Sequence, residues 1–532
     1  MKLLTRQLWM DEVHSWLLLT DPDPSHALTA LADGVDFNPP AWFVVTRTLL
    51  VDPEFANEFQ IRLLSLFWTI TSIAGLCLLL LQRFDLSVSC IAILLTMSQP
   101  LLIHHATEIR FYGFWCACCI WVCVLLSWCP ATSGKLVFQK ACLAILGFAI
   151  CSTHYFGILS IGLMLLPVVW KRWSGWKSDL ISMSLGAGLS LICLVKYLPG
   201  QRAVLSRPTW ISPTTVSDTF GFLNSLLPAW QLAVCLAALL VSMRQFQSIG
   251  QAVIPRNVSE RERFLPLLAL CGMPLLIILV AWCLQPSLVT RYAMICLPAL
   301  AVVSAWALQS CGKNVRIIAA FIASIGLFLA VSNRVRDWAL EEEPRFRLVE
   351  QLRSLPPDAT VIFEDRIEWM PILHHFPDLR ERCCLADFQD GQLSKDSSLR
   401  IVQRDVGRSV QVWYPMYRMI PIDQLAKVSS YYVVPYYGRG LNDLKYPSCG
   451  QIERCSDLLF RRVATVNEAF GTGEITKMKK NFLTRKIPDL LFWKLVLKKT
   501  IAIESVFDCS DLSRLKCSLC NRRDFQVDDT PP

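Results

Sequence analysis

The chain has 532 residues, of which 53% are hydrophobic and only 18% are charged. This apolar content exceeds what one soluble core can bury, so it excludes an ordinary soluble protein and indicates a membrane protein. The net charge of +9 does not indicate nucleic acid, because many basic residues of the first part lie in short segments between apolar runs, as membrane insertion requires.

Residues 1–60 precede the first long apolar run. Pro39 and Pro40 can start a helix. The apolar stretch from Ala41 to Val51 is too short to cross a bilayer, which favours a helix lying at the membrane interface. We therefore expect residues 1–60 to form a first loop with interfacial helices.

About ten apolar segments follow, and each approaches the roughly 20 residues that a spanning helix needs. They cover residues 61–81, 86–103, 110–128, 137–152, 154–170, 179–198, 228–243, 264–283, 287–308 and 315–332. Every second connection between them is basic, which places those connections in the cytoplasm. The membrane domain is thus expected over residues 61–332, with the alternate loops and residues 1–60 on the extracytoplasmic side.

Residues 333–470 return to a soluble composition. Pro344 to Leu355 has helical spacing, and Ala359–Phe363 and Tyr431–Val434 have the pattern of buried strands. This predicts a small extracytoplasmic α/β domain. Residues 471–532 form a basic tail with cysteines, for which disulfides are the first interpretation and a zinc site the alternative.

Two adjacent acids, Asp11 and Glu12, follow Leu8-Trp9-Met10 in the first loop. Acids beside apolar residues at a membrane surface can act as a base or bind a metal. They can equally cap the helix that follows, because acids suit a first helical turn. Both interpretations remain open from these residues alone.

Other charged and aromatic groups fall in loops assigned to the same side. Glu108 and Arg110 form either a functional pair or an interfacial ion pair. His154 and Tyr155 lie between two apolar segments, where they could also be a polar kink. Arg291 enters an apolar segment and should face a cavity or a partner, because an arginine at membrane depth is costly unless paired.

Five short motifs together resemble the GT-C superfamily of membrane glycosyltransferases, which use polyprenyl-phosphate sugars. The nearest likeness is to the bacterial aminoarabinose and galacturonic acid transferases of lipopolysaccharide, with protein O-mannosyltransferases more distant. What carries the resemblance is the order, spacing and common side of the motifs, which are Leu8–Glu12, Asn38–Phe43, Glu108–Tyr112, Thr153–Phe156 and Thr290–Tyr292 with Pro298.

The resemblance implies a GT-C-like helical bundle in a bacterial inner or plasma membrane. It also implies transfer of a sugar from a polyprenyl-phosphate carrier to a lipid, glycan or protein acceptor in the cell envelope. Asp11 would be the base of an inverting displacement, Glu12 and Glu108 would position the sugar or hold a divalent cation, and Arg110 or Arg291 would neutralise the carrier phosphate. The remaining expected substrate-binding residues are Asn38, Tyr112, His154, Tyr155 and Tyr292.

The chain departs from the family pattern in two places. Family members normally have a transmembrane helix before the acidic pair, so we expect codons upstream of Met1 to encode it, with a truncated product as the alternative. Asn38 stands where many relatives have Lys or His, so this position cannot bring a positive charge to the carrier. The competing functions are a lipid-linked sugar transporter or flippase and a non-catalytic GT-C relative.

Overall fold

The computed structural model describes residues 4, 6–128, 132–171, 176–205, 214–226, 264–283, 288–309, 311–363, 366–387, 398–421, 424, 430–434, 473–477 and 493–497. The chain divides into two compact units, residues 1–421 and residues 422–532. The first unit contains all the candidate site residues, from Asp11 to Tyr292.

The described residues of the first loop contain the short helices α2 (Met10–Thr20), α3 (Pro24–Ala32) and α4 (Ala41–Leu49). α3 begins where the Asp23 carboxylate accepts a hydrogen bond from the backbone N–H of Ser25, with Pro24 in the first turn. α4 begins directly after Pro40, so the helix predicted from that proline is confirmed.

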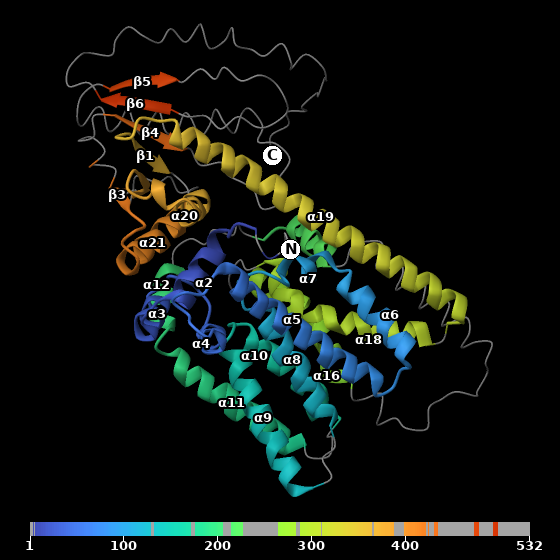
Figure 1. The fold of residues 1–532 in the computed structure, drawn as a ribbon. Helices are drawn as coiled ribbons and strands as arrows, with labels where there is room; N and C mark the ends of the chain where they lie inside the picture. Colours follow the sequence, from blue (N-terminus) through green and yellow to red (C-terminus); the bar gives the residue numbers. More distant parts are fainter. Residues whose placement is uncertain are drawn as a thin grey trace, which may run out of the picture. The chain divides into compact units, whose positions relative to one another are not determined.

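The membrane part is entirely helical in its described residues (Figure 1). Its helices are α5 (Glu58–Leu81), α6 (Leu86–Met97), α7 (Pro100–His105), α8 (Tyr112–Ser127), α9 (Ser133–Cys151), α10 (Gly157–Trp170), α11 (Trp176–Leu194), α12 (Leu198–Leu205), α13 (Val216–Leu226), α16 (Leu265–Ala269), η1 (Leu270–Gly272), α17 (Met273–Cys283), η2 (Thr290–Cys296), α18 (Leu297–Gln309) and α19 (Lys313–Arg353).

Six helical segments among the described residues are long and apolar enough to cross a membrane, and three shorter apolar helices accompany them. The chain is therefore a multi-pass membrane protein, as predicted. The predicted segment 86–103 is interrupted before Pro100, because Gln99 adopts an extended conformation that a following proline favours. The predicted segment 228–243 lies outside the described residues.

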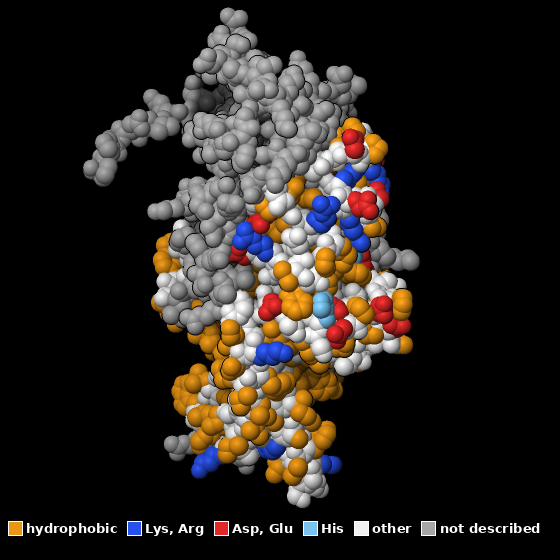
Figure 2. Space-filling model, turned by 90° about the vertical axis from the view of Figure 1, so that its left-hand side faces the viewer, with side chains coloured by type: hydrophobic (Ala, Val, Ile, Leu, Met, Phe, Trp, Pro, Cys, Tyr) orange, Lys and Arg blue, Asp and Glu red, His pale blue; other side chains and the backbone are white. Residues whose placement is uncertain are grey.

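The helices α9 and α11 pack so closely that side chains are excluded from part of their interface. A Cβ atom on Gly186 would lie 2.0 Å from the carbonyl oxygen of Ala144, so only glycine fits there. Their outer faces expose large apolar side chains, including Phe138, Ile145 and Ile192. In the lower part of Figure 2, exposed hydrophobic side chains form a zone with few charges, and basic side chains lie at the bottom of this zone. Such a surface suits lipid.

The helix α19 corrects the predicted boundary between membrane segment and soluble domain. The composition predicts that the membrane domain ends at residue 332 and that a helix covers Pro344 to Leu355, but one helix of 41 residues runs from Lys313 to Arg353. Pro344 removes one backbone hydrogen bond without ending the helix. Figure 1 shows α19 running unbroken from the membrane helices to the sheet that follows.

A three-stranded parallel sheet completes the first unit. Its strands are β1 (Thr360–Phe363), β2 (Cys383–Asp387) and β3 (Met419–Pro421), with Val361 opposite Cys383 and Leu385 opposite Met419. Parallel strands need crossover connections, and these contain α20 (Arg366–His375), η3 (Pro377–Leu379) and α21 (Ser398–Trp413). The predicted strand at Ala359–Phe363 and the α/β character are thus confirmed.

The second unit contains an antiparallel sheet in its described residues. Its order is β4 (Ser430–Val434), β6 (Trp493–Leu497) and β5 (Gly473–Lys477). β4 confirms the strand predicted at Tyr431–Val434. The sequence predicts neither β5 nor β6, both of which lie in the expected tail of residues 471–532. The tail cysteines lie outside the described residues.

Candidate active site

The acidic pair lies in the first turn of α2, but its two carboxylates have different surroundings. Glu12 is completely buried. Its carboxylate lies 2.8 Å from Nη1 of Arg6 and 3.2 Å from Nη1 of Arg62. It also accepts hydrogen bonds from the backbone N–H groups of Ile109, at 2.9 Å, and Trp9, at 3.3 Å. Glu12 therefore joins the start of α2 to α5 and to the loop before α8.

Asp11 has a half-buried carboxylate with a single ion pair among the described residues. Its Oδ2 lies 3.5 Å from Nη2 of Arg291, which comes from η2, and both side chains keep about a sixth of their surface exposed, 18% and 17%. Nε of Arg291 is buried without a hydrogen-bond partner in the part of the chain that the structure describes, and its guanidinium lies over the rings of Trp9 and Tyr292. Both groups thus retain capacity for a ligand.

Arg110 is held by the first loop. Its Nη1 lies 2.5 Å from Oδ2 of Asp36, 3.1 Å from Oγ of Ser15 and 3.2 Å from the carbonyl oxygen of Asp11. Burial lowers the pKa of Arg110, but the carboxylates of Asp36 and Asp11 raise it by more. The side chain is therefore a permanent cation whose charge Asp36 already balances.

The loop that carries Asp36 is fixed from several sides. Both the backbone N–H and the side-chain amide of Asn38 donate to the Asp36 carboxylate. The amide of Gln201 in α12 donates to the carbonyl oxygens of Asp36 and Asn38, and the hydroxyl of Tyr155 donates to the Gln201 side-chain oxygen. The backbone N–H of Ala41 donates to the carbonyl of Ser152, at 2.8 Å, which links this loop to the segment of His154.

His154 lies in an aromatic cage next to Arg291. Its ring stacks on Phe111 and Trp115, with centroids 5.1 Å and 4.8 Å away, and contacts Tyr292 at 4.7 Å. Burial, with help from Arg110 and Arg291, lowers the pKa of His154 to about 3. The imidazole is therefore neutral near pH 7, and its Nδ1 accepts a hydrogen bond from the backbone N–H of Phe156. Tyr112, on α8, is fully buried with a hydroxyl that has no partner among the described residues.

The carboxylate of Glu108 contacts the two histidines that end α7. Its carboxylate lies 2.6 Å from Nδ1 of His105 and 3.1 Å from Nε2 of His104, and 3.9 Å from Nη2 of Arg334. Burial raises the pKa of Glu108, but the two histidines lower it by more, so the group is ionised. Among the described residues, the ion pairs of Glu108 are thus with His104, His105 and Arg334, and not with Arg110 or Arg291.

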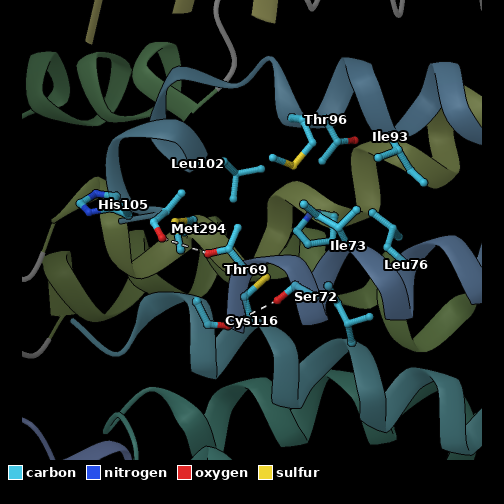
Figure 3. Close-up of a pocket in the computed structure, with 15 residues that line it drawn as sticks. Thr69, Ser72, Ile73, Leu76, Ile93, Thr96, Leu102, His105, Cys116 and Met294 are labelled. Carbon is cyan, nitrogen blue, oxygen red and sulfur yellow. Dashed lines mark hydrogen bonds between the residues drawn. The ribbon is translucent and has the colours of Figure 1, made fainter. Parts of the chain in front are cut away.

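An apolar cavity lies between the helices α5, α6 and α8, and His105 is among the residues that line it (Figure 3). Thr69 and Ser72 of α5 face it, and their hydroxyls donate to backbone carbonyls of the facing loop and of α8. Met294 of η2 and Ile93 of α6 also line it, and His105 lies at one end in Figure 3.

Comparisons with known proteins identify the fold of the chain. No protein-family model and no curated protein matches the chain. In structure, the chain is similar to ArnT from Cupriavidus metallidurans bound to undecaprenyl phosphate, with a TM-score of 0.55, 12% identity, and coverage of 93% of this chain and 95% of that one. For ArnT in the apo state the TM-score is 0.52, the identity 13%, and the coverage 81% and 89%. ArnT is a GT-C glycosyltransferase. This chain has the GT-C fold.

The GT-C fold of this chain brings together charged residues that the motifs did not include. Asp36 partners Arg110, and Arg6 and Arg62 partner Glu12. The position of Arg62 could have indicated its role from the sequence, because an arginine within a predicted apolar segment needs a partner, as Arg291 does. Asp36 carried none, since its partner is 74 residues away.

Proposed function

We propose that this protein is a membrane glycosyltransferase that transfers a sugar from a polyprenyl-phosphate carrier to a lipid, glycan or protein acceptor. The observation that carries the proposal is the ion pair between Asp11 and Arg291. This pair is loose, at 3.5 Å, and partly exposed. Two other pairs are tighter, because Asp36 balances Arg110 at 2.5 Å and Arg6 balances Glu12 at 2.8 Å. A base and a phosphate-binding cation therefore lie side by side.

In the proposed reaction an acceptor hydroxyl oxygen attacks the anomeric carbon and its proton passes to the Asp11 carboxylate. The bond from that carbon to the phosphate oxygen breaks, and the electron pair stays on the leaving polyprenyl phosphate. Attack opposite the leaving group inverts the anomeric configuration. A phosphate leaves without a general acid, so stabilisation of its negative charge is the remaining requirement.

Arg291 is assigned to that phosphate. A guanidinium can hold two phosphate oxygens at once, and donor binding would draw Arg291 from Asp11 and leave the carboxylate free to accept a proton. Neutral His154 adds no charge, and Asn38 is engaged with Asp36. The polyprenyl-phosphate carrier is supported by the likeness to ArnT, whose structure holds undecaprenyl phosphate.

The acidic pair does not fit a divalent cation. Glu12 already faces the guanidinium groups of Arg6 and Arg62, and Arg291 faces Asp11. A dication between the two carboxylates would be repelled by three arginines in contact with them. In our proposal Glu12 holds α2 in place, and Glu108, Tyr112, Tyr155 and Tyr292 shape the surroundings.

We place the site and the α/β domain on the extracytoplasmic side, in a bacterial inner or plasma membrane. The basic loops between the apolar segments support this orientation through the positive-inside rule. The acceptor would then be a component of the cell envelope.

The proposal is tested with the purified full chain in detergent, supplied with polyprenyl-phosphate aminoarabinose, galacturonic acid or mannose and with envelope lipid acceptors. We expect mass spectrometry to detect a glycosylated acceptor and free polyprenyl phosphate for at least one donor. Release of no carrier from any of these donors would count against transferase activity.

We expect Arg291→Gln to weaken donor binding about tenfold to a hundredfold, because a charge-assisted hydrogen bond contributes roughly 1.5 to 3 kcal/mol. Titration with polyprenyl phosphate alone measures this loss. The control is Arg316→Gln, which removes the arginine of another pair, 2.9 Å from Asp85, and should leave the affinity unchanged. Equal affinity of the Arg291→Gln variant would remove this residue from the phosphate site.

Asp36→Asn should lower kcat roughly tenfold to a hundredfold with little change in donor KM, because Arg110 would no longer hold the start of α2 in register. The control is Asp33→Asn, which affects a carboxylate that accepts a bond from Trp413 instead. The double variant Asp36→Asn/Arg110→Met should be no slower than Arg110→Met. If the two losses multiply, Asp36 does not act through Arg110.

A further inference from the structure

A second group of residues with coordinating side chains lies beside the proposed transferase site. His104 and His105 end α7, and Glu108 follows one turn later. One ligand atom of each residue lies within 4.8 Å of those of the others. We call these three residues the α7 cluster.

The α7 cluster has the ligands and spacing of a zinc site. Zinc in proteins binds histidine nitrogen and glutamate oxygen at about 2.0 to 2.2 Å, so neighbouring ligand atoms around a tetrahedral ion are roughly 3.3 Å apart. Nε2 of His104 is 3.1 Å from Oε1 of Glu108, and Nδ1 of His105 is 2.6 Å from Oε2. Small side-chain rotations would therefore admit the ion.

A second observation points to a ligand. Oε1 of Glu108 is buried and receives no hydrogen bond among the described residues, because its neighbour at 3.1 Å, Nε2 of His104, is itself an acceptor from Arg334; this is a costly state for an ionised carboxylate. Nε2 of His104 accepts a hydrogen bond from the guanidinium N–H of Arg334 at 3.1 Å, so Nε2 is the unprotonated ring nitrogen, and its lone pair, now directed at Arg334, is the one that a metal would use. Arg334 thus lies close to where a cation would bind.

A second group of two histidines and a glutamate can be compared with the α7 cluster. Glu58, His374 and His375 also lie within 4.8 Å of one another. There, however, the backbone N–H of Leu8 donates to Nε2 of His375 at 2.7 Å, which fixes the proton on Nδ1, the nitrogen that faces Glu58. That nitrogen has no lone pair for a metal, and the structure gives His105 no such donor at Nε2 among the described residues.

We propose that His104, His105 and Glu108 bind a zinc ion, with the fourth position open to water or to an incoming polar group. The ion would fasten the loop from Ala106 to Phe111, which carries Arg110, to the end of α7. This site is independent of the proposed transferase function, because none of its ligands belongs to the group of Asp11 and Arg291.

Arg334 is the competitor for this position. Its Nη2 lies 3.9 Å from Oε1 of Glu108, and its guanidinium stacks over Trp338 at 4.3 Å. Zinc binding would require the guanidinium to shift along this ring. We therefore expect Arg334→Gln to bind zinc about tenfold more tightly than the natural chain, since one like charge is removed.

The test uses the full chain in detergent, stripped with EDTA and titrated with zinc or cobalt chloride. The natural chain should gain one equivalent of zinc that His105→Gln lacks, and zinc should raise the unfolding temperature of the former only. His104→Gln, at a side chain that is 39% exposed, gives the same comparison if His105→Gln does not fold. His375→Gln is the matched control and should bind normally.

Cobalt distinguishes the α7 cluster from the cysteines of the C-terminal tail. A histidine and carboxylate site gives weak visible bands without the strong near-ultraviolet band of thiolate ligands. Loss of the weak bands in His105→Gln supports the proposal. Equal binding by the natural chain, His104→Gln and His105→Gln, or binding through thiolates alone, would overturn it.

Discussion

Asp11→Asn should reduce sugar transfer about a hundredfold to ten-thousandfold, the range expected when a general base is lost. The variant should still insert, fold and bind the carrier, because the Asp11 carboxylate makes one ion pair of 3.5 Å among the described residues. An amide cannot take the proton of the attacking hydroxyl. The measurement is the rate of carrier release from the donor sugar that proves active, at saturating donor.

Asp11→Glu provides the matched control, since it keeps the carboxylate and displaces it by one methylene. It should retain more activity than Asp11→Asn. A non-catalytic GT-C relative or a flippase would release no carrier from the donor in any of the three proteins. Full transfer activity in Asp11→Asn would refute the assignment of the base.

The sequence was most informative where a physical requirement is local. Apolar runs predict spanning helices because each helix must be long enough to cross the bilayer and must satisfy its own backbone hydrogen bonds there. Pro40 marks the start of α4 because proline fixes its own backbone angle φ. The order of the motifs led to the GT-C fold, although overall identity with ArnT is only 12%. Short motifs at loop positions thus carried more information than the chain as a whole.

The sequence failed where the requirement was not local. It gave Glu12 and Glu108 the same role, at the sugar or a divalent cation. Only the fold distinguishes Glu12, which lies between two arginines, from Glu108, which lies beside two histidines. It also placed a boundary at residue 333, because composition changes there. The helix α19 continues through that change, since Ala339 to Glu343 has strong helix propensity.

Glu12 and Asp11 should differ most clearly in how much each contributes to the stability of the fold. Glu12→Gln should destabilise the protein by about 3 to 5 kcal/mol, because it leaves Arg6 and Arg62 buried against a neutral amide. Both guanidinium groups contact the Glu12 carboxylate, and the side chain of Arg62 is completely buried. We expect a clear fall in the unfolding temperature in detergent, whereas Asp11→Asn should unfold near the natural temperature.

Arg62→Met should cost less than Glu12→Gln, because it leaves one balanced pair between Glu12 and Arg6, whose guanidinium also lies 4.9 Å from the ring of Trp338. The double variant Glu12→Gln/Arg62→Met should lose less stability than the sum of the single losses, since it removes one of the two uncompensated charges. Additive losses would mean that Glu12 and Arg62 act separately. A loss confined to catalysis would make Glu12 part of the chemistry instead of its support.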